Sequence, residues 1–386
     1  MPISNSSINI CDFKQTRVRK KNKYDLIGRF KNLVVNRISF PKKLNTGYEV
    51  TKNNDIYVYL RGDLIEANDF LKRYSLRCRY TTIENEDTGS IAVIEIYNVN
   101  GNLSPEELEK RKNEEIYILF SHGNNTDIGH MFFKYTRLCA FLNVNLVSYD
   151  YSGYGHSSGK ASEGNMYSNI ANVYKYMTNK MKLGPRQIVL YGKGLGSAPS
   201  CYLVSEHYCY PVGGLILHSP IASGLRIFFK SIIKHHSLDS FDNTEFLKNC
   251  PLIPVFLMHG ISDNQIPLEQ AVELTCIIKE SHELIRAERL KQIQENKLEK
   301  GSSNEMAVEA THLNQENIQV IPRGRFSQVI QDARKVNQTN QYVKTWWIEG
   351  AGHNDIEKTN SADYYDHLSD FINLCKKWQK EHISSC

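Results

Sequence analysis

With 386 residues, the chain is long enough to bury a complete hydrophobic core in one large domain or two small ones. Its 41% hydrophobic and 23% charged residues are ordinary for a soluble globular protein, and no segment approaches the roughly 18 consecutive apolar residues of a membrane helix. The net charge of +5 is mild for this length and argues against nucleic acid as a partner, because nucleic-acid-binding domains are usually far more basic.

Residues 1–11 lack the apolar run of a secretory signal, so we expect a cytoplasmic protein. The nine cysteines are scattered singly, without a C-x-x-C pair, which is typical of reduced thiols rather than of a disulfide framework or a metal site. The sequence therefore predicts no metal site and no cofactor.

Residues 1–45 are predicted to form a flexible arm, followed by a single domain over residues 46–386. Soon after Cys11 the arm carries a basic cluster made of Lys14, Arg17, Arg19, Lys20, Lys21 and Lys23. A solvated, disordered arm is the more common behaviour of such a cluster. The alternative hypothesis is peripheral contact with the cytosolic face of a membrane, where S-acylation of Cys11 and the basic cluster together provide two anchoring signals.

From residue 116 onward, short aliphatic runs alternate with helix-compatible stretches, which is the pattern of a parallel sheet built from βαβ units. The expected strands are 116–120, 144–149, 187–191, 213–217, 254–258 and 343–348, with 91–97 as an antiparallel strand at the sheet edge. The expected helices are 127–142, 163–181, 195–207, 268–278 and 363–377. Residues from about 280 to 341, rich in Glu, Lys, Gln and Asn, are predicted to be a charged insert outside the core, formed by a helix and a loop.

The run Tyr-Gly-Lys-Gly-Leu-Gly-Ser at 191–197 lies at a turn from strand to helix, where an α/β-hydrolase fold carries its G-x-S-x-G nucleophile elbow. Gly192 and Gly196 are the outer glycines of that elbow, because the turn is too tight for side chains there. The central position, where the motif has serine, is Gly194. Glycine adopts the strained backbone angles of the elbow freely, so this residue relieves about 1–3 kcal/mol of strain and removes the nucleophile.

Acidic and basic partners follow later strands in the chain order that this fold uses. Asp263 follows the strand 254–258 and His353 follows the strand 343–348. In such a triad the acid orients the imidazole, which accepts the proton of the nucleophile. The backbone N–H groups of Asn124 and Leu195 are the candidates for an oxyanion hole. We therefore predict the α/β-hydrolase fold, a mostly parallel, doubly wound sheet flanked by helices, with a charged insert before the last strand.

Four runs of the sequence are shared with a known family: FSHGN (120–124), SYDYSGYGHSSGK (148–160), LILHSPIASGLR (215–226) and WIEGAGHNDIE (347–357). The chain resembles the α/β-hydrolase domain-containing protein 17 family over residues 116–275 and 343–375, about half of its length. Members of that family are serine hydrolases that remove palmitate from S-acylated proteins at membranes. The resemblance implies S-acylated proteins or fatty-acyl groups as partners, and it carries the acid onto Asp263, the base onto His353 and the nucleophile onto position 194.

The chain also departs from the family at two places besides Gly194. The family has a cluster of acylated cysteines at its N-terminus, whereas this chain has only Cys11 among its first 77 residues. The charged insert separates Asp263 from His353, which lie close together along the chain in the family. Such an insert is expected to emerge near the catalytic face.

Gly194 leaves several functional hypotheses open. The first is a catalytically inactive or strongly impaired homologue that binds acyl groups or acylated proteins, because loss of a triad member removes most of the rate. The second is an active (thio)esterase in which His353 and Asp263 activate a water or a substitute nucleophile. The candidate substitutes are Ser121, Ser157, Ser158, Ser197 and Cys201.

Two further interpretations concern the glycines themselves. A glycine-rich turn can bind phosphate, although this one lacks the third spacing and the acidic ribose partner of a dinucleotide loop. Serine and glycine codons differ by one base, so a sequence error or a minor allele also accounts for Gly194. Lys193, beside the turn, contacts an anionic group or faces solvent, and facing solvent is the more common arrangement for a lysine.

Overall fold

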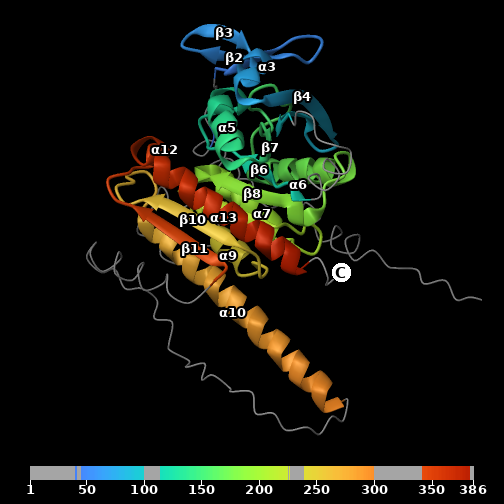
Figure 1. Ribbon diagram of the computed structural model, residues 1–386, viewed down its shortest axis with the longest axis vertical. Coiled ribbons are helices and arrows are strands. Elements are labelled where there is room, and N and C mark those ends of the chain that lie inside the picture. The colour runs from blue at the N-terminus through green and yellow to red at the C-terminus, as the bar shows by residue number, and fades with distance from the viewer. Residues whose placement is uncertain are drawn as a thin grey trace, which may run out of the picture.

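The computed structural model describes residues 40, 45–99, 114–224, 226, 239–299 and 341–382, and its main feature is an eight-stranded sheet (Figure 1). The strand order is β11-β10-β9-β8-β6-β7-β5-β4. The parallel strands are β6 (Tyr117–Ser121), β7 (Asn145–Tyr149), β8 (Ile188–Lys193), β9 (Gly214–His218), β10 (Val255–Gly260) and β11 (Val343–Ile348). These confirm the six predicted strands, with bounds that shift by no more than two residues.

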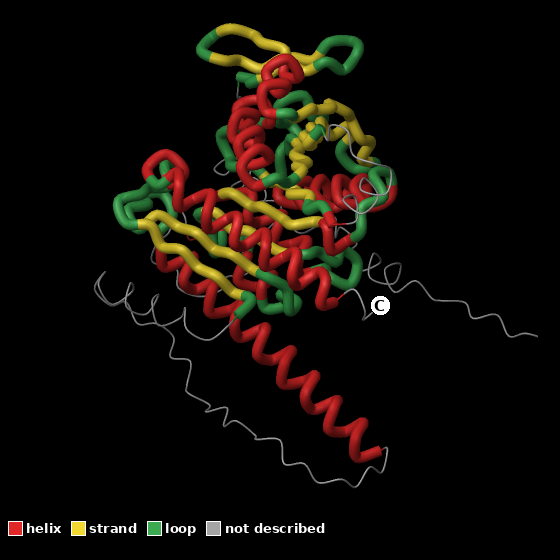
Figure 2. Tube along the Cα trace, viewed as in Figure 1, coloured by secondary structure: helices red, strands yellow, loops and turns green. Residues whose placement is uncertain are grey.

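Helices cover both faces of the sheet (Figure 2). Residues of α6 (Glu163–Asn179), α7 (Ser197–Ser205), α9 (Asn243–Leu247) and α10 (Leu268–Glu299) join one core cluster, and residues of α5 (Ile128–Leu142) and α13 (Ser361–His382) join the other. Successive side chains of a strand point to opposite faces, so Leu190 of β8 packs in the first cluster and Tyr191 in the second. The doubly wound α/β-hydrolase architecture predicted from the sequence is therefore present.

The N-terminal part of the sheet was only partly predicted. β5 (Gly89–Asn98) pairs antiparallel with β7, as expected for 91–97, but β4 (Leu76–Asn85) pairs with it and forms the edge. A separate sheet contains β1 (Tyr48–Val50), β2 (Ile56–Leu60) and β3 (Asp63–Glu66), which is followed by the short helix α3 (Ala67–Leu71). Phe40 is buried, and its ring lies 6.0 Å from the ring of Phe241.

The helix predicted over 268–278 and the charged helix predicted from about residue 280 form one continuous helix, α10, through Glu299, so the break predicted between them was wrong. Ser281 and His282, inside the predicted insert, are buried against the domain. The Ser281 hydroxyl donates to the carbonyl oxygens of Lys248 and Cys250, at 3.0 and 2.9 Å. Figure 1 shows the second half of α10 running away from the sheet. The basic cluster, Cys11 and residues 300–340 lie outside the described residues.

Two searches of the described residues bear on function. No helix among them is long and apolar enough to cross a membrane. No group of three or more His, Cys, Asp or Glu side chains among them is arranged to hold a metal ion.

Candidate active site

The turn after β8 has the geometry of a nucleophile elbow. Gly194 has a φ of +53°, in the left-handed region that glycine tolerates best, and a short 3-10 helix (η3, Gly194–Gly196) leads into α7. A side chain at Gly192 would bring its β-carbon within 2.6 Å of the Gly196 carbonyl oxygen. A β-carbon at Gly196 would overlap the carbonyl oxygen of Ser121. Both outer glycines are therefore required by close backbone approach, as their spacing predicts.

The predicted acid and base meet beside this turn. His353 Nδ1 lies 2.8 Å from Asp263 Oδ2, and the carboxylate is fully buried while the imidazole is 13% exposed. A neutral imidazole that donates from Nδ1 keeps Nε2 free to accept a proton. A β-carbon at Gly194 would lie 3.3 Å from that Nε2. The structure therefore brings Gly194, Asp263 and His353 together in the relative positions of a triad, without the nucleophile's side chain.

Several donors fix the Asp263 carboxylate. Its Oδ1 accepts the backbone N–H groups of Gln265 and Ile266, both at 2.9 Å. Burial alone would raise the pKa of Asp263, but hydrogen bonds from His259 and His353 outweigh it and hold the pKa below its usual range. The carboxylate is therefore ionised at neutral pH and orients the imidazole of His353.

His259 is a residue of this site that the sequence reasoning missed. Its Nε2 lies 2.9 Å from the Ile266 carbonyl oxygen and 3.3 Å from Asp263 Oδ2, and its side chain is fully buried. The available signal was the run His-Gly-Ile-Ser-Asp, which places a histidine four residues before the acid. His259 acts as a positioning residue, because it contacts the carboxylate and not the pocket.

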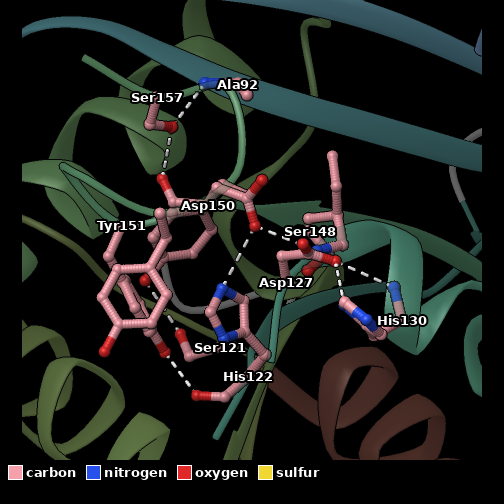
Figure 3. Close-up of polar contacts among 12 residues, drawn as sticks. Ala92, Ser121, His122, Asp127, His130, Ser148, Asp150, Tyr151 and Ser157 are labelled. Atoms are coloured by element: carbon pink, nitrogen blue, oxygen red, sulfur yellow. Dashed lines mark hydrogen bonds and ion pairs between the residues drawn. The ribbon is translucent and has the colours of Figure 1, made fainter. Parts of the chain in front are cut away.

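The loop after β6 is tied to the sheet by a buried polar network (Figure 3). His122 Nδ1 donates to the Gly123 carbonyl oxygen at 2.8 Å, and its Nε2 lies 3.3 Å from Asp150 Oδ1. The Tyr151 hydroxyl donates to the His122 carbonyl oxygen at 2.6 Å. These contacts fix the backbone that leads to Asn124, one of the two predicted oxyanion-hole residues.

Asn124 and Leu195 both line the pocket that contains Gly194 and His353. The side-chain oxygen of Asn124 accepts a hydrogen bond from the Tyr154 hydroxyl at 2.7 Å, which anchors the residue. Their backbone N–H groups remain the predicted oxyanion donors.

Ser197 and Cys201 on α7 are occupied or inaccessible. The Ser197 hydroxyl donates to the Gly194 carbonyl oxygen at 2.7 Å and accepts from the Asn243 side-chain amide at 3.1 Å. Cys201 is fully buried, and this burial raises the pKa of its thiol well above the usual value. Neither side chain lines the pocket.

The other three candidate substitutes also lie away from the pocket. The Ser121 hydroxyl bonds to that of Tyr149 at 2.9 Å, and the Ser158 hydroxyl bonds to that of Ser90 at 2.7 Å. The Ser157 hydroxyl donates to the Asp150 carbonyl oxygen at 2.8 Å (Figure 3). The geometry therefore places none of the five predicted substitutes beside His353.

The pocket has a volume of about 460 Å³, and both polar and apolar residues line it. Lys193 lines this pocket and is half-buried, so it is less exposed than a lysine that simply faces solvent. The apolar lining comes from Met131, Leu195, Ile221, Phe241 and Ile266, and the remaining polar lining includes Asn125, Thr126, Gln265 and Asn354.

Comparisons with known proteins confirm the resemblance found in the motifs. No family model matches the chain. The alpha/beta hydrolase domain-containing protein 17C of mouse is 32% identical over 255 residues, which are 66% of this chain and 59% of that protein. The human 17B protein is 36% identical over 162 residues, 42% of this chain and 55% of that protein. This chain is a homologue of the alpha/beta hydrolase domain-containing protein 17 family.

The chain spans less than two thirds of the length of these 17B and 17C relatives. Among solved structures, the Pyrococcus furiosus esterase Pf2001 superposes with a TM-score of 0.51 and 12% identity, over 78% of this chain and 94% of the esterase. At that identity the likeness shows the α/β-hydrolase fold alone.

Proposed function

We propose that this homologue of the domain-containing protein 17 family binds acyl groups or acylated proteins and is catalytically inactive or strongly impaired. The observation that carries this proposal is the position of His353 Nε2, which faces Gly194 where a nucleophile's side chain belongs. None of the described lining residues is a serine or a cysteine. Without a nucleophile, the buried Asp263–His353 pair has no hydroxyl to deprotonate.

The acyl part of the proposal rests on the pocket and on the family. The wall formed by Met131, Ile221, Phe241 and Ile266 is apolar, as an aliphatic chain requires. Removal of palmitate from S-acylated proteins, the activity that the resemblance implies, requires a pocket of this character. We propose peripheral membrane contact through the basic arm as a further feature, since acylated proteins are found at membranes.

One observation favours a second candidate, an esterase that uses water. His353 Nε2 faces an open pocket, and Gly194 leaves room that a serine side chain would otherwise fill. A general base within hydrogen-bond reach of a water contributes roughly 10²–10⁴-fold to a rate, far less than a complete triad. A water-based enzyme would therefore be slow.

The test is hydrolysis of a fatty-acyl thioester by the native protein, Gly194→Ser and the double variant Gly194→Ser, His353→Ala. We expect a native rate near the buffer background, a rise on the order of 10³-fold in Gly194→Ser, and loss of that rise in the double variant. Gly164→Ser is the matched control, because position 164 is exposed and a β-carbon there meets nothing within 4 Å.

The same proteins treated with a fluorophosphonate probe separate the candidates. Only Gly194→Ser should be labelled if the native protein is inactive. A native rate that His353→Ala abolishes, in a native protein that the probe does not label, would establish the water mechanism instead. A native rate that Thr126→Val abolishes would identify the Thr126 hydroxyl, which lines the pocket, as a nucleophile.

A further inference from the structure

Lys193 is a charged residue in the pocket that the triad does not use. It ends β8 immediately before Gly194, is half-buried, and lines the same pocket as Gly194 and His353. Desolvation and the neighbouring Lys134 ammonium lower the pKa of Lys193 to about 8. Within the described part of the chain, its ammonium forms neither a hydrogen bond nor an ion pair. A partly buried ammonium in this state is stabilised by any anion that enters the pocket.

The carboxylate of Glu357 interacts electrostatically with Lys193, but it is already paired with other cations. The Lys134 ammonium lies 3.2 Å from Glu357 Oε2, and Arg137 Nε donates to Glu357 Oε1 at 2.7 Å. Burial alone would raise the pKa of Glu357, but Lys134 and Arg137 lower it to about 2. Three cationic side chains, those of Lys134, Arg137 and Lys193, therefore interact electrostatically with one carboxylate, which leaves net positive charge among these groups.

The elements that carry these groups are continuous with the pocket. Lys134 is on α5, one turn after Met131, which lines the pocket, and Glu357 is on α12 (Ile356–Thr359), which follows the lining residue Asn354. Leu195, Ile221, Phe241 and Ile266 complete the apolar wall and belong to one buried core cluster. The lining of the pocket therefore combines one cationic residue, Lys193, with apolar residues suited to an aliphatic chain.

We propose that Lys193 binds the carboxylate of a free fatty acid whose aliphatic chain lies along this apolar wall. The inference rests on the proposed function, because it names the ligand that the acyl-binding pocket retains. A fatty acid carries both features that the pocket matches, an anionic head and an apolar chain. An ester, a thioester or an alcohol of the same length lacks the anion and leaves Lys193 unpaired.

Titration calorimetry of the full chain with dodecanoate, dodecanol and acetate, each below its aggregation limit, tests the proposal. We expect dodecanoate to bind the native protein about tenfold or more tightly than dodecanol, and acetate not to bind measurably. Lys193→Gln should weaken the binding of dodecanoate by about tenfold or more and leave the affinity for dodecanol unchanged. Lys358→Gln makes the same charge change on the exposed side of α12, outside the pocket, and should change neither ligand.

Other outcomes overturn specific parts. Equal affinities for dodecanoate and dodecanol, unaltered by Lys193→Gln, would reject the carboxylate site but leave acyl binding intact. Binding of neither aliphatic ligand by the native protein would reject the proposed function as well. Binding of acetate as tight as that of dodecanoate would reject the claim that the aliphatic chain contributes to binding. If Lys193→Gln unfolds at a lower temperature than the native protein, Lys193→Met replaces it in the test. The preference of the native protein for dodecanoate over dodecanol tests the carboxylate site without any variant.

Discussion

The imidazole of His353 faces the α-carbon of Gly194 so closely that a β-carbon at position 194 would lie 3.3 Å from Nε2. Asp263 orients that imidazole from the far side, with 2.8 Å between His353 Nδ1 and Asp263 Oδ2. The acid, the base and the elbow therefore keep the arrangement of a serine hydrolase although the nucleophile is missing.

Gly194 is constrained by its backbone angle more than by space. Because its φ is +53°, Gly194→Ala should lower the free energy of unfolding by about 1–3 kcal/mol. Gly164→Ala, in the exposed first turn of α6, should raise it by about 0.5–1 kcal/mol. Urea denaturation measures both, and an unchanged Gly194→Ala midpoint would contradict the strain argument.

Gly196 is constrained by space. A β-carbon there would overlap the Ser121 carbonyl oxygen and lie 2.6 Å from that of His122, and backbone atoms cannot move aside as a side-chain end can. Gly196→Ala should therefore cost about 3 kcal/mol or more, or prevent soluble expression. A loss no larger than that of Gly194→Ala would show that the elbow shifts easily. Thermal melting of the two variants together makes the comparison.

The sequence predicted those site residues whose type is required at their position by sterics or by the chain order of the fold. Gly192 and Gly196 are required by sterics, and Asp263 and His353 follow strands that the aliphatic pattern marks clearly. His259 was missed because its role is a contact with Asp263 and not a motif position. The pocket position of Lys193 was missed because the side-chain direction of a lysine depends on neighbours from distant segments, here α5 and α12.

The fold shows the same division. Five of the parallel strands were found because each is mostly buried and carries aliphatic residues in succession, whereas β11 was found from its β-branched and aromatic residues. β4 was missed because its residues alternate between buried and exposed and include Arg77 and Arg79, so the run looks polar. α10 was predicted as two helices because the apolar face fades after Ile278, whereas the helix continues without a break into charged residues that favour helical structure.

Ser197 should prove structural. Its hydroxyl satisfies the Gly194 carbonyl oxygen and accepts from Asn243, so Ser197→Ala should lower the free energy of unfolding by about 1–3 kcal/mol. In the Gly194→Ser background the same change should leave thioester hydrolysis within about threefold at a temperature where the variant is folded. Denaturation and initial rates measured on one preparation test both statements. Complete loss of turnover in the folded variant would contradict a structural role.

Asp263 should matter for stability as well as for turnover. Its pKa is lowered in the folded protein, so its ionised form stabilises the fold above the unfolded pKa of about 3.9, and this contribution is lost as the pH falls below that value. Asp263→Asn should therefore be less stable than the native protein at pH 7, with a difference that shrinks toward pH 3. In the Gly194→Ser background it should slow hydrolysis on the order of 10³–10⁴-fold. Denaturation at both pH values and a rate assay measure these effects.

Binding of dodecanoate should depend on the charge of Lys193. Because the pKa of Lys193 is about 8 in the free protein, its ammonium is mostly charged at pH 7 and mostly neutral at pH 9.5. Dodecanoate affinity should therefore fall by about tenfold or more over that range, while its own carboxylate stays ionised and dodecanol binding stays constant.

Other titratable groups near Lys193 could also contribute to this pH dependence, so the measurement needs a control. They are Lys134 on α5, Glu357 on α12, His353 before α12 and His218 on β9. The Glu357 pKa of about 2 and the lowered pKa of His218 keep both charges constant between pH 7 and 9.5. Burial also lowers the pKa of Lys134, so part of the change can come from that residue. Lys193→Gln isolates the Lys193 part, because a pH dependence that persists in this variant must come from another group, such as Lys134.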